Sequence, residues 1–241
     1  MSQSATFDRI ERDPTPSLHA DGQAHWDISP EVLATIDRLV KPGMRTLETG
    51  AGRSTLHFLA AGAEHTAITV EPEEVSAITR EAIRQGIKTD QLSVELGFSH
   101  HVLPNVDADP LDFALIDGGH GFPVPAIDYA YIAPRLKVGG YLLIDDVDLW
   151  TGKMIVDFLK AEPGWAFEGL LRRRSALFRV TAPVQLREWT NQPHVVRASR
   201  ISQNWRKVRN LMDLVLSGDF SAIRGKFAKE KALANAARDD Y

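Results

Sequence analysis

The chain has 241 residues, of which 44% are hydrophobic and 25% charged, an ordinary globular composition that excludes a wholly disordered or collagenous protein. It contains no cysteine, which excludes thiolate zinc sites, iron–sulfur clusters and cysteine nucleophiles. The net charge of −4 combines an excess of nine acidic side chains in residues 1–195 with an excess of five basic side chains in residues 196–241.

Residues 1–27 are polar and show no sustained periodicity, so we expect an N-terminal arm there. The first residues do not resemble a signal peptide, and no apolar run approaches the ~20 residues of a membrane span. A soluble, cytoplasmic protein is therefore expected. Ser29 and Pro30 then predict the start of a helix, with Ser29 as its N-cap.

From residue 44 onward, short apolar segments alternate with segments of helical periodicity. The predicted strands are 44–49, 66–70, 92–96, 111–116 and 141–144, with Gly139 and Gly140 turning the chain before the fifth. Helices are predicted between them, and 165–171 and 176–180 form a closing hairpin around residues 172–175. This alternation predicts an α/β fold: a Rossmann-like, mainly parallel sheet with helices on both faces.

Acidic residues stand at the carboxyl ends of four predicted strands. Glu48 precedes a Gly-Ala-Gly turn, Glu71 and Asp117 end the second and fourth strands, and Asp145 and Asp146 end the fifth. In an open parallel sheet, ligands bind at this edge, near the point where the strand order reverses. The pattern therefore predicts a ligand site.

Glu71 stands 21 residues after Gly50, a spacing that suits hydrogen bonds to ribose hydroxyls and favours an adenosine-type cofactor. The alternative is a structural turn followed by a solvated glutamate. Thr55 stands where a dinucleotide fingerprint needs Gly or Ala, and Glu48 would face a pyrophosphate, so both count against NAD. S-adenosylmethionine has no phosphate and two cationic groups, which neighbouring carboxylates would favour.

Together these segments resemble the class I S-adenosylmethionine-dependent methyltransferases, in their small-molecule O-methyltransferase-like branch. The matching segments are 48–54 (ETGAGRS), Glu71, 116–120 (IDGGH) and 136–146 (LKVGGYLLIDD). The resemblance covers about residues 28–182 and implies a seven-stranded sheet with an antiparallel last strand. It leaves out the arm, 1–27, and a basic helical extension, 183–241.

The resemblance also implies roles for single residues. Glu71 would hold the ribose of S-adenosylmethionine, and Asp117 would lie near its methionine end. The residues implied to bind this cofactor are Glu48, Gly50, Gly52, Ser54, Glu71, Phe98, Ser99 and Asp117.

Some relatives bind a divalent cation at positions that correspond to Asp117, Asp145 and Asp146. An all-oxygen set suits a hard ion such as Mg²⁺. Consecutive strand residues point to opposite faces, so Asp145 and Asp146 can share an ion only if the strand has ended. Catechol-type relatives carry Asn where this chain has Asp146. The alternative is that these carboxylates support neighbouring groups or cap a helix.

His120, three residues after Asp117, is the expected general base, with Asp117 beside it in the catalytic centre. An imidazole titrates near neutral pH and can accept the proton of a hydroxyl acceptor. The alternative is a histidine that only hydrogen-bonds within its loop. The candidates for the wall of the acceptor pocket are Tyr129, Tyr131 and Trp150, although aromatic residues at helical spacing more often pack in a core.

After residue 193 the pattern changes to that of a basic amphipathic helix, with Trp205, Val208, Leu211, Met212 and Val215 on one face and a second helix beginning near Asp219. We expect these helices to dock on the core or on a partner subunit, the latter giving a homo-oligomer. The alternative is a basic surface for an anionic acceptor, a membrane face or nucleic acid.

The sequence thus predicts an S-adenosylmethionine-dependent methyltransferase that acts on a hydroxyl, less readily an amine, of a small molecule such as a sugar or secondary metabolite, with or without a divalent cation. Two alternatives stay open: an NAD-dependent oxidoreductase, and a non-catalytic methyltransferase-like partner module. No nucleic-acid motif is recognised, which makes RNA the less favoured acceptor.

Overall fold

A computed structural model describes residues 28–107 and 110–218. The predicted N-terminal arm and the second tail helix lie outside these residues. Contacts divide the chain into two units, with the division between Arg187 and Glu188. The first unit holds the sheet, and the second holds helix α8 (Pro193–Leu216). No helix among the described residues is long and apolar enough to cross a membrane.

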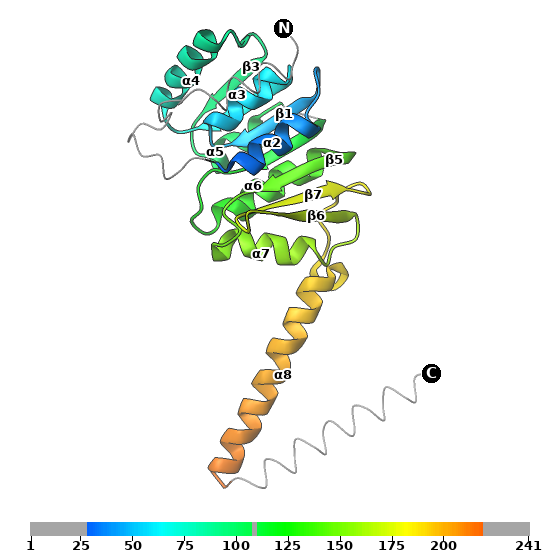
Figure 1. Ribbon diagram of the computed structural model, residues 1–241. Helices are drawn as coiled ribbons and strands as arrows, with labels where there is room; N and C mark the ends of the chain where they lie inside the picture. Colours follow the sequence, from blue (N-terminus) through cyan, green and yellow to red (C-terminus); the bar gives the residue numbers. More distant parts are fainter. Residues whose placement is uncertain (1–27, 108–109, 219–241) are drawn as a thin grey trace. The chain divides into compact units, whose positions relative to one another are not determined.

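A seven-stranded sheet forms the centre of the first unit, in the order β3-β2-β1-β4-β5-β7-β6 (Figure 1). Strands β1 to β5 pair in parallel, whereas β7 pairs antiparallel with both β5 and β6. The predicted α/β fold, with its mainly parallel sheet and antiparallel closing strand, is confirmed. The strands are β1 (Arg45–Thr49), β2 (Glu64–Thr69), β3 (Leu92–Leu96), β4 (Leu111–Ile116), β5 (Leu136–Ile144), β6 (Trp165–Leu171) and β7 (Ser175–Val180).

Helices cover both faces of this sheet, because successive strand residues point to opposite sides and both sides are apolar. Phe113 and Leu115 of β4 pack in one core with α2 and α3, while Ala114 and Ile116 pack in the other with α6 and α7. A third cluster joins α3 to α4. The helices are α2 (Pro30–Leu39), α3 (Arg53–Ala60), α4 (Pro72–Gln85), α5 (Ser99–Val102), α6 (Val124–Ile132) and α7 (Trp150–Leu159).

Helix α2 begins where the sequence predicts it. Ser29 is the N-cap, its Oγ accepting a hydrogen bond from the Val32 amide at 3.4 Å, and Pro30 occupies the first turn. Val32 and Ile36 are completely buried against the sheet, so the cap fixes the start of a helix that contributes directly to the core.

Strand β5 differs from its prediction. It runs from Leu136 to Ile144 straight through Gly139 and Gly140, which were predicted to form a turn, so that prediction is wrong. A Cβ at Gly140 would lie 2.9 Å from the carbonyl oxygen of Asp112, and the β4–β5 register shifts between Leu111 and Phe113. Gly140 thus allows close strand approach at an irregularity in the sheet, whereas Gly139 supplies the φ of +90° beside it.

The strand order reverses between β1 and β4. From β1 the chain proceeds through β2 to β3 at one edge, then returns to place β4 on the other side of β1. The carboxyl ends of β1 and β4 therefore flank a topological switch point, where open α/β sheets bind their ligands.

Candidate active site

A cavity of about 350 Å³ lies at this switch point, lined by the segments that follow β1 to β5. Its wall holds all the residues predicted to bind the cofactor, to catalyse or to hold a cation, except Glu48 and Asp145. The aromatic residues predicted for the wall of an acceptor pocket do not line it. The predicted residues on the wall are Gly50, Gly52, Ser54, Glu71, Phe98, Ser99, Asp117, His120 and Asp146. Five strand ends therefore contribute to one cavity.

Gly50 lets two of these strand ends meet. Its φ is +91°, and a Cβ built on it would lie 2.4 Å from the carbonyl oxygen of Asp117. Its amide donates to the carbonyl oxygen of Ile68 at 2.8 Å, which ties the turn to β2. Only glycine satisfies both the backbone conformation and the close approach.

Glu48 lies behind the cavity wall, although the resemblance implied that it would line the cofactor site. The side chain is 1% exposed, and its carboxylate accepts hydrogen bonds from Ser54 Oγ at 2.6 Å and from Thr55 Oγ1. His65 Nε2 lies 3.1 Å from the same carboxylate. A buried carboxylate needs such partners, and these fix the first turn of α3 beneath the cavity.

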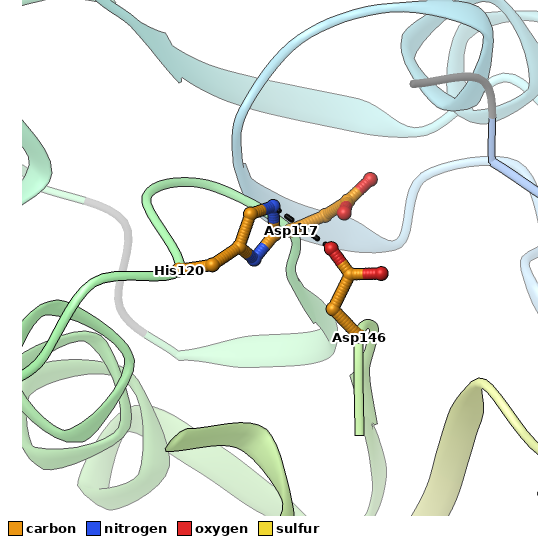
Figure 2. Close-up of side chains that lie close together, drawn as sticks. All are labelled: Asp117, His120 and Asp146. Atoms are coloured by element: carbon orange, nitrogen blue, oxygen red, sulfur yellow. Dashed lines mark ion pairs between the residues drawn. The ribbon is translucent and has the colours of Figure 1, made fainter. Parts of the chain in front are cut away.

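Asp117, His120 and Asp146 lie close together at the mouth of the site (Figure 2). His120 Nε2 is 3.0 Å from Asp146 Oδ2, and each of the three residues offers a ligand atom within 4.8 Å of the others. Asp146 has a φ of +51°, which is rare for a residue other than glycine. Such strained residues are concentrated at functional sites.

Arg174 also lines the cavity, and the sequence analysis did not identify it. Its Nε donates to Asp146 Oδ1 at 2.6 Å, so Asp146 lies between a guanidinium and an imidazole. The β5–β7 register explains this: Ile144 pairs with Ala176, and continuing the pairing two residues brings Arg174 opposite Asp146. The sequence did predict the hairpin that carries Arg174. Placing Arg174 beside Asp146 would also have required the register of that hairpin against β5.

The same register separates Asp145 from the set predicted to bind a cation. Ser175 lies opposite Asp145 and donates its hydroxyl to the Asp145 carboxylate, which is 4% exposed. The group that the structure brings together is Asp117, His120 and Asp146, without Asp145. Consecutive carboxylates at the end of β5 thus serve different partners.

The site concentrates negative charge. Burial raises the pKa of Asp117 well above its usual range, and the charges of Asp145 and Asp146 raise it further. The hydrogen bond with His120 lowers the pKa of Asp146, and Arg174 adds to this effect. A ligand with a positive charge beside Asp117 would relieve the repulsion, whereas a phosphate would increase it.

Asp128 on α6 lies behind the cavity and is completely buried. Neither of its carboxylate oxygens has a hydrogen-bond partner among the described residues. Burial raises the pKa of Asp128, and the neighbouring hydroxyls of Ser99 and Thr49 oppose the shift only in part. The neutral acid is therefore favoured over a wider pH range than for an exposed aspartate.

We expect Asp128→Asn to raise the free energy of unfolding at pH 8 by about 1 kcal/mol or more. A carboxyl group whose pKa is raised by folding contributes fully to the stability of the folded state below its ordinary pKa. This contribution is lost as the pH rises through the raised pKa, and asparagine, which does not ionise, avoids the loss. The gain should therefore vanish near pH 4 in urea titrations. Asp148→Asn, at an exposed position, is the control, and an equal gain at both pH values would contradict the assignment.

Comparison with known proteins finds a matching domain family and solved structures of similar fold. Residues 47–147 match the family model described as a methyltransferase domain. No curated protein matches the chain. A solved structure of the O-methyltransferase TomG from Streptomyces achromogenes, in complex with S-adenosylmethionine, is similar over 73% of this chain and 90% of that one, with 14% identity and a TM-score of 0.59.

Two further solved structures are similar. The Bacillus cereus O-methyltransferase in complex with S-adenosylhomocysteine is 17% identical over 74% of this chain and 91% of its own, with a TM-score of 0.56. The S-adenosylhomocysteine-bound methyltransferase PaMTH1 of Podospora anserina is 16% identical over 75% and 88%, with a TM-score of 0.52. At these identities the likeness concerns the fold.

Proposed function

We propose that the chain is an S-adenosylmethionine-dependent methyltransferase that transfers the methyl group to a hydroxyl oxygen of a small molecule such as a sugar or secondary metabolite. The match of residues 47–147 to a methyltransferase domain supports this activity. One observation carries the proposal: Glu71, Asp117 and His120 line a single cavity. Glu71 suits the ribose of the cofactor, Asp117 its positively charged end, and His120 proton transfer.

The cavity fits S-adenosylmethionine better than a dinucleotide. Carboxylates beside the ligand favour the cationic sulfonium and ammonium groups and oppose a pyrophosphate. Thr55, which breaks the dinucleotide pattern, donates its hydroxyl to Glu48 and accepts from the Gly52 amide at 3.0 Å. The turn after β1 is therefore organised around the buried carboxylate of Glu48, and it departs from the glycine-rich turn that holds a pyrophosphate. This supports S-adenosylmethionine over NAD.

His120 is the residue we propose for proton removal. With Nε2 directed at the charged Asp146, the ring donates there, and Nδ1 is left to accept the proton of the acceptor hydroxyl. Arg174 holds Asp146 from its other oxygen, which fixes the imidazole indirectly. Bound S-adenosylmethionine supplies an electrophilic methyl group: the new O–C bond forms as the S–C bond breaks, and the chain contributes chiefly by positioning.

An exposed aromatic pair, with one ring two residues after His120, supports a ring-containing acceptor. Phe122 and Trp150 are 67% and 64% exposed, and their ring centroids are 5.9 Å apart. Thr151 donates its hydroxyl to the His120 carbonyl oxygen at 2.8 Å, which ties the start of α7 to the loop that carries the proposed base. Exposed rings can cover a flat apolar ring or a sugar face beside His120.

A divalent cation is a second candidate for activating the acceptor. Asp117, His120 and Asp146 would hold it, since their ligand atoms lie within 4.8 Å of one another. A bound cation would lower the pKa of the acceptor hydroxyl. Arg174 already bonds Asp146, and its positive charge opposes a second cation there, so we favour the route through His120.

Calorimetric titration with S-adenosylhomocysteine tests the proposal. We expect saturable binding without added metal, and Glu71→Gln should weaken it about tenfold or more because a charged hydrogen-bond acceptor to the ribose is lost. Glu73→Gln, on the exposed first turn of α4, is the matched control.

Absence of saturable binding, with or without Mg²⁺, would sink the proposal, and binding of NAD in its place would establish the oxidoreductase. Binding without turnover of any hydroxyl or amine acceptor would favour the non-catalytic module. Activity that is lost with a chelator and restored by Mg²⁺ would favour the cation route.

A further inference from the structure

Within the part of the chain that the structure describes, helix α8 presents an exposed apolar face. It is 24 residues long, and none of them is buried. The apolar side chains on this face are Ile201, Trp205, Val208, Met212 and Val215, exposed by 55%, 71%, 49%, 59% and 51%. A single helix is only marginally stable in water without tertiary contacts, so a helix of this length and composition calls for a partner.

The spacing of these residues identifies the kind of partner. They follow one another at intervals of four, three, four and three residues, which is the heptad repeat of a coiled coil. Trp205 and Met212 take the first core position of the repeat, and Ile201, Val208 and Val215 take the second. Over these two heptads, supercoiling of the two helices would keep the apolar seam facing the partner helix.

We propose that α8 forms a parallel, in-register two-stranded coiled coil with α8 of a second copy of this chain, which makes the protein a homodimer. The flanking positions support this pairing. A parallel register places Arg197 beside Ser202 of the second copy and Asn204 beside Arg209 of the second copy, so no like charges meet.

The last flanking pair extends the apolar seam, because Leu211 lies beside Leu216 of the second copy. The remaining basic residues, Arg200, Arg206 and Lys207, occupy the outward positions of the repeat and leave the seam free of charge. The positive charge of the tail therefore does not oppose dimerisation directly.

Two other arrangements fit less well. An antiparallel pair in which Val208 packs against Met212 of the second copy would place Arg209 opposite Arg209 of the second copy, a like-charge contact beside the seam. A lipid surface needs a broad apolar face, but Arg197 and Asn204 lie within this face beside the seam residues. In the parallel coil both occupy polar flanking positions.

Sedimentation equilibrium of the full-length protein tests the dimer. We expect twice the mass of the chain for the wild type, and Val208→Glu should raise the dimer dissociation constant by about 100-fold or more, because two charges would be buried in the seam. Gln203→Glu, which places the same charge at the outward position, should leave it unchanged. Thermal unfolding of the first unit should be equal in both variants.

The absence of cysteine permits a test of orientation. In a parallel coil Ile201 faces Ile201 of the second copy, so Ile201→Cys should form an intermolecular disulfide on mild oxidation and Gln203→Cys should not. A dimer that lacks the Ile201→Cys crosslink would overturn the parallel register.

A wild-type monomer at every accessible concentration would overturn the dimer. If that monomer also bound phosphatidylserine vesicles, the face would be a lipid-binding one. A dimer that Val208→Glu leaves intact would show that the interface lies elsewhere, and it would also overturn the proposal that α8 forms it.

Discussion

Replacing His120 with alanine is expected to lower kcat by about 10²–10⁴-fold, the usual contribution of a general base, while changing the affinity for S-adenosylhomocysteine far less. The reason is geometric: His120 Nε2 is committed to Asp146 at 3.0 Å, which leaves Nδ1 as the atom for proton transfer. Single-turnover methyl transfer to an accepted hydroxyl substrate, beside a calorimetric titration, separates the two effects.

His101→Ala is the control, because His101 is exposed and does not line the cavity. It should leave kcat within about twofold, well under the effect of a general base. Asp146→Asn should give an intermediate loss, since the ring keeps a hydrogen-bond partner at Nε2 but loses its ion-pair partner. An unchanged kcat for His120→Ala would show that positioning alone drives the reaction.

Gly50→Ala is expected to weaken S-adenosylhomocysteine binding by at least about 100-fold and to lower the free energy of unfolding by about 2–4 kcal/mol. Two costs combine. The left-handed conformation at φ +91° is unfavourable for alanine, and the new methyl group would lie 2.4 Å from the carbonyl oxygen of Asp117. The ends of β1 and β4 would have to separate, and the cavity lies between them.

Gly121→Ala is the matched control from the loop that carries His120, since a Cβ there meets nothing within 4 Å and its φ lies outside the range that favours glycine. Urea unfolding and calorimetry should both return wild-type values for it. If Gly50→Ala behaved in the same way, the contact between the two strand ends would not shape the cofactor site.

The elements that the sequence predicted best are those bounded on both sides by clear turn signals. Strands β3 and β4 match their predicted ranges residue for residue. Polar turn segments bound both of them, with alternating apolar and polar residues in β3 and a mainly apolar run in β4. Strand β5 was predicted too short because a glycine pair looks the same in a turn and in a strand irregularity. The difference depends on how closely the neighbouring strand approaches, which no local pattern encodes.

The candidate site shows a similar division. Strand-end position predicted which segments meet at the cavity, since the topology of a parallel sheet decides that. It did not predict side-chain direction: Glu48 turns inward to Ser54 and His65, and Asp145 turns to Ser175. Arg174 was missed for a different reason, because its place depends on a pairing between segments about thirty residues apart.

Strand β7 lies between β5 and β6 although it is the last strand in the sequence, so the last strand to be synthesised takes an interior place in the sheet. During synthesis, every glycine and carboxylate of the cavity leaves the ribosome before Arg174 does. Until β7 inserts beside β5, Asp146 lacks its guanidinium partner and the arrangement that orients His120 is incomplete. A chain that ended before Arg174 would therefore contain the glycines and carboxylates of the cavity but would lack the guanidinium that contacts Asp146.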